Sequence, residues 1–357
     1  MPTIPIPKVA SDITAEWADT VLTHAGYDVA ISEVAVSPIG TGQMADSLRV
    51  VPDYSSVTPS APSTFVVKMA SNDPNSRAAG QRGAYLKEVR FYERLSAQLG
   101  VATPQSLWSD IDLETSDFAI VLEDMAPAVQ GDQIIGGDAD SIEAAAINIA
   151  GLHAPFWCDE KLHEYAWLSP PLDQREASVR DLKAILTMVT PGFIDRYRNR
   201  IDDHHIDLLN WFADTVDTWI QDDRGRFALM HGDHRLDNLL FNAADPIRPV
   251  TVVDWQTLAV RNPMADISYL LGTGLDAQTR RRVEHDIVAR YHEQLVTLGI
   301  DNYAQSECFD DYRTQSPHAL LLTVLGSMLT VQTDRGDDMF MAMLHRSSNQ
   351  IFDLDIR

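Results

Sequence analysis

The pattern of hydrophobic and polar positions differs between the two parts of the chain. Up to residue 124, turn residues separate short β-branched and aromatic segments, and helical periodicity is confined to two segments. Residues 53–63 are rich in Ser, Pro and Thr, which indicates a loop between strands. Nothing suggests alternating βαβ units. The pattern predicts strands at 34–39, 47–51, 64–69 and 118–122, and helices at 13–26 and 83–99.

Helical patterns dominate the rest of the chain. Residues 130–140 are rich in Gly and Asp, which is typical of a linker. Asp140 stands at an N-cap position with Glu143 as its capping-box partner, and this predicts a helix that runs through His153. Further helices are expected on both sides of a short β segment, and beyond Pro263 they continue almost to the end of the chain.

The short β segment consists of two expected strands, at 238–241 and 250–254, joined as a hairpin by the turn over 242–249. Together with the strand-rich first part, it predicts an α+β fold of two lobes. A small lobe with an antiparallel sheet would span residues 1–125, and a larger, mainly helical lobe would span 126–357. We expect a cleft between the two lobes.

Composition narrows the choice of partners. Asp and Glu number 52 against 28 Lys and Arg, a formal net charge of −24, which argues against binding nucleic acid or anionic membranes. The same charge could steer a cationic substrate or simply aid solubility. Cys158 and Cys308 predict neither a disulfide framework nor a thiolate zinc site. The first ten residues lack a signal-peptide pattern and the apolar run 319–331 is too short for a bilayer, so we expect a cytoplasmic protein.

The strongest chemical signal is residues 230–241, Met-His-Gly-Asp-His-Arg-Leu-Asp-Asn-Leu-Leu-Phe, where charged groups directly precede an apolar strand. Phosphoryl transfer needs one carboxylate to accept the proton of the attacking hydroxyl, and a carboxylate with an amide oxygen to hold Mg²⁺. Asp233 and Asn238 have the spacing of the base and the magnesium-binding Asn in protein kinases. Asp254 follows at the exit of the next β-branched segment. We therefore expect Asp233 to be the catalytic base, and Asn238 and Asp254 to be metal ligands.

These segments resemble the aminoglycoside phosphotransferase and choline kinase superfamily, whose catalytic loop reads His-Gly-Asp followed by Asn. The motifs Glu-Asp-Met at 123–125, Leu-His-Ala at 152–154 and Asp-Trp-Gln at 254–256 are most similar to ecdysteroid kinase-like and related bacterial members. The resemblance covers nearly the whole chain and is most specific over 231–269. It implies a bilobal protein-kinase-like fold, and an enzyme that uses ATP and Mg²⁺ to phosphorylate a hydroxyl of a small molecule.

The resemblance also implies roles at the nucleotide. Lys68 would pair with the α and β phosphates, and Glu88 would hold that lysine by an ion pair. Glu123 and Met125 would belong to the hinge against adenine. Asp266 would support the catalytic loop without acting chemically.

Helical spacing independently supports the ion pair. Glu88 shares a helix face with mainly apolar residues, and an unpaired buried carboxylate would be costly. Lys68 is the expected partner of Glu88. Glu93, which falls on another face of the helix, is the alternative partner for the lysine.

A glycine turn, Gly40-Thr41-Gly42, lies ahead of Lys68. It lacks the third glycine of a dinucleotide fingerprint, a strand follows it, and no Gly-Lys pair exists to form a Walker loop. Its place between two strands predicts a flap over the phosphates. Ser47 is a candidate phosphate contact or an ordinary strand residue.

The histidines have structural interpretations. His231 and His234 flank the expected base, but they lie in a loop without an evident third ligand, so His231 is expected to brace the loop by hydrogen bonds. His153 is expected to be structural. The pair at 204–205 is expected on a solvated helix face.

Other functions are weighed against the small-molecule kinase. Protein kinases differ because they have His-Arg-Asp, Asp-Phe-Gly and a later Ala-Pro-Glu, none of which occurs here. A catalytically silent nucleotide-binding pseudokinase is the main alternative, although the complete set of expected site residues argues against it. A hydrolase with paired acids would turn over without ATP.

The acceptor and the oligomeric state stay open. Aminoglycosides, choline-like amines, sugars, amino-acid alcohols and steroid-like alcohols are all compatible with the motifs. Aromatic residues in the second part could line a partly apolar acceptor site or simply pack in the core. These residues are Trp157, Trp167, Phe193, Tyr197 and Trp211.

Overall fold

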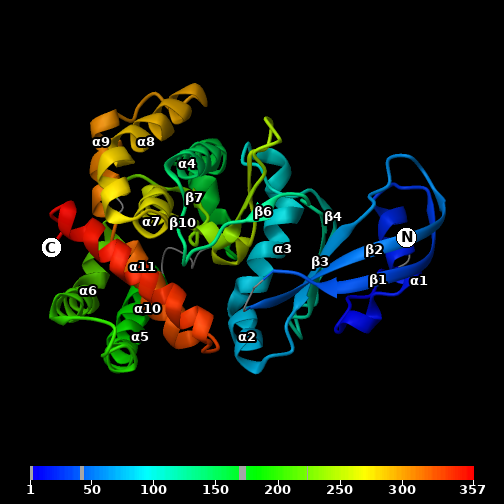
Figure 1. The fold of residues 1–357 in the computed structure, drawn as a ribbon, viewed down its shortest axis with the longest axis horizontal. Helices are drawn as coiled ribbons and strands as arrows, with labels where there is room; N and C mark the ends of the chain where they lie inside the picture. Colours follow the sequence, from blue (N-terminus) through cyan, green and yellow to red (C-terminus); the bar gives the residue numbers. More distant parts are fainter. Residues whose placement is uncertain (1–2, 41–43, 169–173, 223) are drawn as a thin grey trace. The chain divides into compact units, whose positions relative to one another are not determined.

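The computed structural model describes residues 3–40, 44–168, 174–222 and 224–357. The chain forms two compact units (Figure 1). The first unit comprises residues 1–98, 103–128 and 253–256, and the second comprises 99–102, 129–252 and 257–357. Each unit therefore includes a short segment that is remote in sequence from its main part.

The first unit is built on a five-stranded antiparallel sheet in the order β1-β2-β3-β5-β4. The strands are β1 (Val29–Pro38), β2 (Ala45–Val57), β3 (Phe65–Ala70), β4 (Ser106–Ile111) and β5 (Phe118–Glu123). On the central strand β3, Phe65, Val67 and Met69 are buried in the core. Lys68 points to the opposite face because side chains alternate along a strand. Its register partners are Ser47 and Ile120.

Helices pack on both faces of this sheet. They are η1 (Ala10–Asp12), α1 (Ala15–His24), α2 (Pro74–Ala79), the π-helical turn η2 (Gly80–Ala84), α3 (Tyr85–Arg94) and η3 (Ser96–Gln98). Helix α1 begins at Thr14, whose side chain accepts a hydrogen bond from the Trp17 N–H at 3.2 Å. Trp17 packs with Val67 on one face of the sheet. Helix α3 lies on the other face, which is the side of Lys68.

Two predictions for this unit need correction. Strand β2 continues to Val57, in register with Val29, so residues 53–63 are only partly loop. Beyond Val50 the strand pairs with β1 alone, and such an edge tolerates Pro52, which has no N–H to donate. Strand β4 was not predicted, because its half-buried residues lack a clear alternation of apolar and polar positions.

The second unit is mainly helical and holds two small sheets, β6-β8-β9 and β10-β7. Its α-helices are α4 (Ala139–His153), α5 (Arg175–Arg196), α6 (Asp203–Gln221), α7 (Met264–Gly274), α8 (Ala277–Thr297), α9 (Gln305–Thr314), α10 (His318–Leu329) and α11 (Asp334–Asp353). Its strands are β6 (Val129–Gln130), β7 (Ala228–Met230), β8 (Leu239–Phe241), β9 (Val250–Val252) and β10 (Ala259–Arg261). Short helices are η4 (Ala154–Phe156), η5 (Glu160–Glu164) and η7 (Leu236–Asn238), and η8 (Trp255–Thr257) includes residues of both units.

The predicted hairpin is confirmed, because β8 and β9 pair antiparallel. The predicted cap of α4 is wrong. The helix begins at Ala139, and the carboxylate of Asp138, instead of that of Asp140, accepts a hydrogen bond from the Ser141 N–H at 2.8 Å. Asp138 has the extended backbone that an N-cap requires.

Helix α7 is the central element of the second unit, since every one of its 11 residues is buried. An apolar cluster joins α5, α6, α10 and α11, and it includes Phe193, Tyr197, Phe212 and Leu344. Two of the aromatic residues considered for the acceptor, Phe193 and Tyr197, are thus core residues. The buried α7 offers a rigid base for polar side chains that point from it to neighbouring loops.

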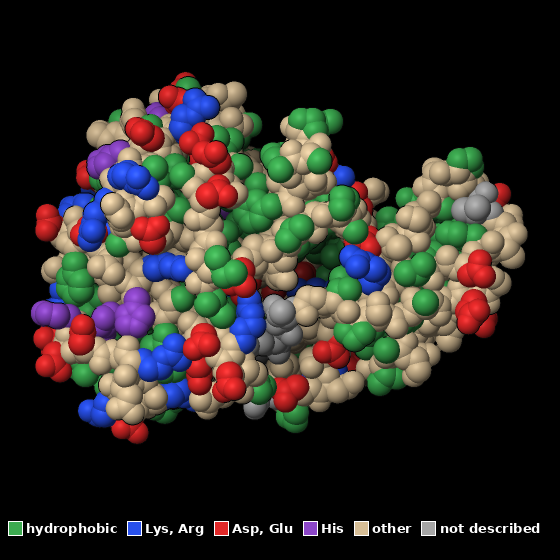
Figure 2. All heavy atoms as spheres, viewed as in Figure 1, with side chains coloured by type: hydrophobic (Ala, Val, Ile, Leu, Met, Phe, Trp, Pro, Cys, Tyr) green, Lys and Arg blue, Asp and Glu red, His purple; other side chains and the backbone are tan. Residues whose placement is uncertain are grey.

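The surface carries mixed charges. Figure 2 shows acidic and basic side chains interspersed over the visible face of the second unit, so no single acidic patch marks a cationic docking site on this face. Within the described residues, no helix is both long enough and apolar enough to cross a membrane. Cys158 is exposed and Cys308 is buried, and both are free thiols.

Candidate active site

In the first unit, Lys68 brings two carboxylates together. Its Nζ lies 2.8 Å from each carboxylate oxygen of Glu88 and 3.1 Å from Oδ1 of Asp254. The expected Lys68–Glu88 ion pair is therefore formed, whereas the alternative, Glu93, pairs with Arg90. Burial opposes the positive charge of Lys68, but the Asp254 and Glu88 carboxylates outweigh burial and raise the pKa of the lysine. Lys68 is thus a fixed positive charge at neutral pH.

Asp254 is held in a strained backbone conformation. Its φ is +69°, in the left-handed region that non-glycine residues rarely adopt. The next residue, Trp255, anchors the segment: its ring stacks on Phe91 with centroids 3.8 Å apart, and its Nε1 donates to Thr103 Oγ1 at 3.1 Å. This anchoring compensates for the strain and keeps Asp254 beside Lys68.

Part of the expected phosphate flap can be located. Gly40 follows β1 with φ +73°, a conformation that suits glycine, while Thr41 and Gly42 lie outside the described residues. Ser47 lies on β2, opposite Lys68 in the strand register. Gly40 and Ser47 thus flank the turn near the lysine, and their contact with phosphates stays a prediction.

The expected hinge follows strand β5. Glu123 ends the strand, and its carboxylate accepts a hydrogen bond from the Gln105 N–H at 3.2 Å. Asp124 accepts two hydrogen bonds from Arg49, at 2.6 and 3.0 Å. Met125 comes next and is partly buried. The segment is therefore fixed by its carboxylates, and its contact with adenine stays a prediction.

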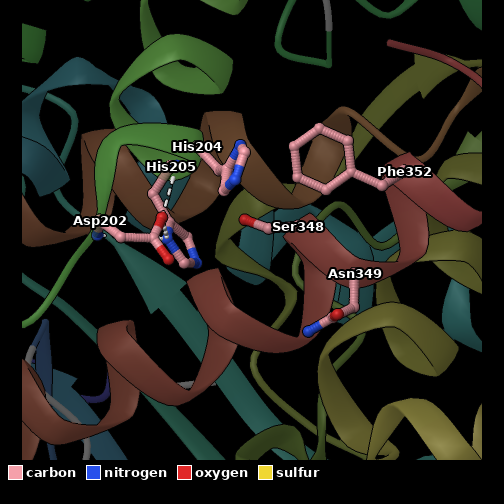
Figure 3. A pocket seen from close by; sticks show the side chains of 6 residues that line it. All are labelled: Asp202, His204, His205, Ser348, Asn349 and Phe352. Atoms are coloured by element: carbon pink, nitrogen blue, oxygen red, sulfur yellow. Dashed lines mark hydrogen bonds and ion pairs between the residues drawn. The ribbon is translucent and has the colours of Figure 1, made fainter.

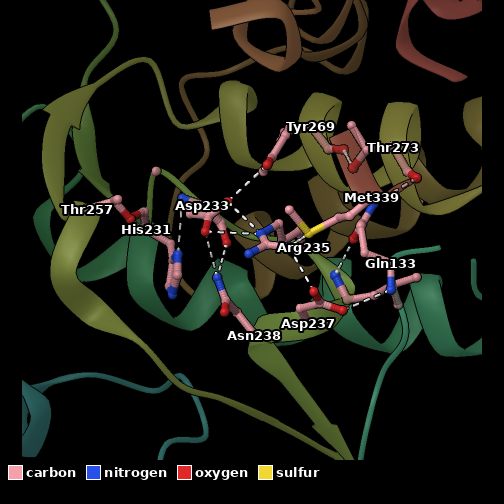
Figure 4. Close-up of polar contacts among 12 residues, drawn as sticks. Gln133, His231, Asp233, Arg235, Asp237, Asn238, Thr257, Tyr269, Thr273 and Met339 are labelled. Carbon is pink, nitrogen blue, oxygen red and sulfur yellow. Dashed lines mark hydrogen bonds and ion pairs between the residues drawn. The ribbon is translucent and has the colours of Figure 1, made fainter. Parts of the chain in front are cut away.

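In the second unit, Asp233 lies in the loop between β7 and β8, where three side chains donate hydrogen bonds to its carboxylate (Figure 4). Tyr269 Oη lies 2.9 Å from Oδ1, and Asn238 Nδ2 lies 2.9 Å from Oδ2. Arg235 Nε lies 3.0 and 3.1 Å from the two oxygens. Asn238 Nδ2 also donates to the backbone oxygen of Asp233 at 2.8 Å. The carboxylate is thus oriented from three sides, and Oδ1 of Asn238 is left for another partner.

A buried carboxylate on α7 fixes the start of this loop. Asp266 accepts hydrogen bonds from the backbone N–H groups of His231, at 2.6 Å, and Gly232, at 2.8 Å, and its Oδ2 lies 3.2 Å from His153 Nε2. Burial disfavours the charge on Asp266, but the contact with His153 and the other interactions around the carboxylate together outweigh burial and keep the pKa of this carboxyl below its usual range. Gly232 has φ +85°, and a Cβ there would lie 2.5 Å from the carbonyl oxygen of Thr257, so the turn requires glycine.

Arg235 and Asp237, for which no chemical role was predicted, belong to the same network. Arg235 donates from Nη1 to Asp237 Oδ2 at 3.0 Å, and Arg335 reaches both carboxylate oxygens of Asp237 at 3.2 Å. The backbone N–H of Gln133 also donates to Asp237, at 2.9 Å. Burial disfavours the charge on Asp237, but Arg235, Arg335 and the Gln133 N–H together outweigh burial and lower the pKa of the carboxyl. The alternating charges at positions 233, 235 and 237 could have predicted that Arg235 and Asp237 interact with Asp233. Arg335 could not have been predicted in this way, because it lies far from these positions in the sequence.

Tyr269 was also missed. It follows Asp266 by three residues, so both side chains lie on one face of α7, and this spacing could have identified it. His234 is fully buried, and burial lowers its pKa to about 3, so it is uncharged near neutral pH. His231 Nδ1 accepts a hydrogen bond from the Asp233 N–H at 3.2 Å, the bracing contact that was expected.

Comparisons with known proteins agree on the fold. The model of the ecdysteroid kinase-like family matches residues 42–300. The GDP and kanamycin complex of APH(2")-IIIa is 14% identical with a TM-score of 0.54, covering 95% of this chain and 99% of its own. The gentamicin complex of APH(2")-IIa is 14% identical with a TM-score of 0.50, covering 94% and 98%. Ethanolamine kinase from Plasmodium vivax is 12% identical with a TM-score of 0.52, covering 88% and 82%. Comparison with curated protein sequences gives no match.

Proposed function

The chain belongs to the ecdysteroid kinase-like family, and from this membership we propose that it is a phosphotransferase that uses ATP and Mg²⁺ to phosphorylate a hydroxyl group of a small molecule. The observation that carries the proposal is the Asp233 carboxylate, which three side-chain donors hold in place. The kinase-like fold, shared with aminoglycoside phosphotransferases and an ethanolamine kinase, supports the same reaction class.

Asp233 is the proposed general base. One of its oxygens accepts the proton of the acceptor hydroxyl while the hydroxyl oxygen forms a bond to the γ-phosphorus and the bond to the β–γ bridging oxygen breaks. Tyr269 and Asn238 fix the direction of the carboxylate, and Arg235 places a positive charge beside it. Positioning and charge neutralisation, with no covalent intermediate, supply most of the rate in this mechanism.

Asn238 and Asp254 are the proposed magnesium ligands. Mg²⁺ prefers oxygen ligands, and Asn238 uses its Nδ2 to bind Asp233, so its Oδ1 has the chemistry that the ion requires. When bound, the ion neutralises phosphate charge. The fixed positive charge of Lys68, held by Glu88, suits the α and β phosphates.

The remaining nucleotide contacts follow from the family resemblance. The turn at 40–42 and Ser47 would cover the phosphates, and Glu123 and Met125 would contact the adenine. The acceptor is proposed only as a hydroxyl-bearing small molecule, because neighbours of this fold are named for substrates as different as aminoglycosides and ethanolamine.

The test is an ATP-consumption assay with Mg²⁺ on a panel of small-molecule alcohols. Wild type should show acceptor-dependent turnover, and Asp233→Ala should reduce it by about 10²- to 10⁴-fold because the general base is lost. Asp207→Ala, which removes an exposed carboxylate on α6, is the matched control and should leave turnover unchanged. Normal turnover by a folded Asp233→Ala protein would refute the mechanism, and ATP binding without transfer to any acceptor would favour a silent nucleotide-binding module.

A further inference from the structure

The segment at residues 129–137 follows the first unit in the sequence and has no role in the proposed function. Its glycines and aspartates predicted a linker, but the structure places it against the catalytic loop, residues 231–238. Strand β6 pairs with β8, which follows the loop directly. The N–H of Gly131 donates a hydrogen bond to the carbonyl oxygen of Leu239 at 3.0 Å. The segment is therefore fixed along the end of the loop.

The approach of the segment to the loop is close enough to require glycine. A Cβ on Gly131 would lie 2.6 Å from the carbonyl oxygen of Leu236, so the backbone would have to shift to admit it. Gln130 Nε2 donates to the carbonyl oxygen of Asp237 at 2.5 Å. Both contacts are made with the turn η7, which ends at the proposed magnesium ligand Asn238. A displacement of the segment would therefore move this turn.

Gln133 joins the segment to two other elements of the second unit (Figure 4). Its side chain is fully buried. Oε1 accepts a hydrogen bond from the N–H of Leu236 at 3.0 Å, and Nε2 donates to the carbonyl oxygen of Thr273 at 2.8 Å. The backbone N–H of Gln133 donates to the Asp237 carboxylate at 2.9 Å. One residue thus connects the turn of the catalytic loop with the end of α7.

The two side-chain contacts require a carboxamide. A backbone N–H needs an acceptor and a backbone carbonyl needs a donor, so the amide must present its oxygen to Leu236 and its nitrogen to Thr273. Methionine, which has a similar length, offers no donor and only a weak acceptor. Arg346 also donates to the Thr273 oxygen, at 3.0 Å, so the loss of the Gln133 side chain would fall mainly on the buried N–H of Leu236.

The turn that Gln133 holds carries residues that orient the base. Asn238 donates to the backbone oxygen and to the carboxylate of Asp233. Asp237 accepts a hydrogen bond from Arg235 at 3.0 Å, and Arg235 in turn donates to Asp233. Gln133 therefore acts on Asp233 through two separate intermediates, one on each side of the carboxylate.

We propose that Gln133 is a positioning residue for phosphoryl transfer, because it fixes the turn at 236–238 against α7 and thereby the orientation of Asp233 and Asn238. The inference rests on the proposed function, which assigns these two residues to the reaction. It makes the segment 129–137 a part of the catalytic machinery instead of a passive linker.

A polar cluster around His205 on α6 supplies the control. The side chain of His205 is only 15% exposed, so the expectation of a solvated histidine pair fails for this residue. Its ring lies 2.6 Å from the Asp202 carboxylate and 3.1 Å from His345, near a cavity of about 390 Å³ (Figure 3). The residues that line this cavity come from the start of α6 and the second half of α11. His205→Leu therefore removes two polar contacts that involve no residue of the catalytic loop.

The first readout is hydrogen exchange at single amides, measured by NMR on the full chain without substrates. In Gln133→Met, the Leu236 N–H should exchange faster by about tenfold or more, because it loses its acceptor. The N–H groups of His231 and Gly232, which Asp266 binds, should keep wild-type rates. The control His205→Leu should leave all three rates unchanged.

The second readout is transfer kinetics with ATP, Mg²⁺ and an acceptor from the alcohol panel. Gln133→Met should lower kcat about tenfold and leave the KM for ATP within about twofold of wild type, because the base is misoriented while the nucleotide contacts are kept. His205→Leu should match wild type. Gln133→Asn, which keeps the amide on a shorter side chain, should show the same changes to a smaller extent, and it replaces Gln133→Met if that variant does not fold.

The outcomes separate this inference from the proposed function. Wild-type exchange at Leu236, or a wild-type kcat, in a folded Gln133→Met or Gln133→Asn protein would overturn the role of Gln133. Equally faster exchange at His231, Gly232 and Leu236 would also overturn it, because the effect would then be a general loss of stability. Absence of transfer in wild type would refute the proposed function, and the exchange rates would still decide whether Gln133 holds the loop.

Discussion

The two units position their key carboxylates by different means. In the first unit, Glu88 sits on a helix and its partner Lys68 on the central strand, so regular secondary structure and strand register set the geometry. In the second unit, Asp233 sits in a loop, and its position depends on hydrogen bonds from side chains and on the buried helix α7. The Lys68–Glu88 arrangement should therefore tolerate the loss of a neighbouring side-chain contact. The loop that holds Asp233 should lose its structure when one buried contact is removed.

The largest effect is expected at the brace of the loop. Asp266→Ala leaves two buried backbone N–H groups and His153 without their acceptor, and removal of one partner from a buried charged network costs about 3–5 kcal/mol. Chemical denaturation should show this loss. Asp286→Ala, which removes an exposed carboxylate on α8, is the control and should change stability little. A stable Asp266→Ala protein would show that the loop does not depend on α7.

The same residue predicts a pH dependence. The folded state keeps the pKa of Asp266 below its usual value, so its contribution to stability is present above the unfolded pKa of about 3.9 and is lost as pH falls below it. The stability difference between wild type and Asp266→Asn should therefore shrink as the pH is lowered below about 4. Urea denaturation at a series of pH values measures this difference, and a constant difference down to pH 2 would contradict the assignment.

The next largest effect concerns the nucleotide. Lys68→Ala removes the fixed charge that Glu88 and Asp254 hold, and nucleotide affinity should fall about tenfold or more because charge-assisted contacts are lost. Calorimetry with ATP and Mg²⁺ measures the change. Lys161→Ala, at an exposed lysine of the second unit, should leave affinity unchanged. If Lys68→Ala bound ATP with wild-type affinity, the proposed role of the first unit in nucleotide recognition would be wrong.

A smaller effect is expected from a single hydrogen bond to the base. Tyr269→Phe deletes the donor to Asp233 Oδ1 and keeps the buried ring, so transfer should slow by about tenfold while nucleotide affinity is preserved. The control is Tyr165→Phe, whose ring lies beside that of Trp167. Steady-state kinetics distinguishes a lower kcat from a higher KM, and a change in KM alone would mean that Tyr269 does not orient the base.

The smallest effect is expected in the first unit. Trp255→Phe removes the indole hydrogen bond to Thr103 and keeps an aromatic ring against Phe91, so stability should fall by only about 1 kcal/mol. Thermal unfolding measures it. If Trp255→Phe reduced stability as much as Asp266→Ala, the two units would not differ in their sensitivity to the loss of one buried contact, contrary to our proposal.

Local patterns explain which parts of this molecule could be predicted. The Lys68–Glu88 pair could be predicted because strand alternation and helix spacing are short-range signals. The β8–β9 hairpin could be predicted because a turn lies between two apolar runs. Arg335 reaches Asp237 across 98 positions, and no local pattern encodes such a contact. The extension of β2 to Val57 was not predicted, because a strand segment rich in Ser and Pro at the edge of a sheet has the composition of a loop.

We propose that the first unit recognises the nucleotide while Asp233 in the second performs the chemistry. The most direct test of this proposal is to measure ATP affinity by calorimetry with Mg²⁺, together with the rate of phosphoryl transfer, on Asp233→Asn. We expect ATP affinity within about twofold of wild type and transfer slower by about 10²- to 10⁴-fold. Transfer at the wild-type rate, or a parallel loss of ATP binding, would contradict it.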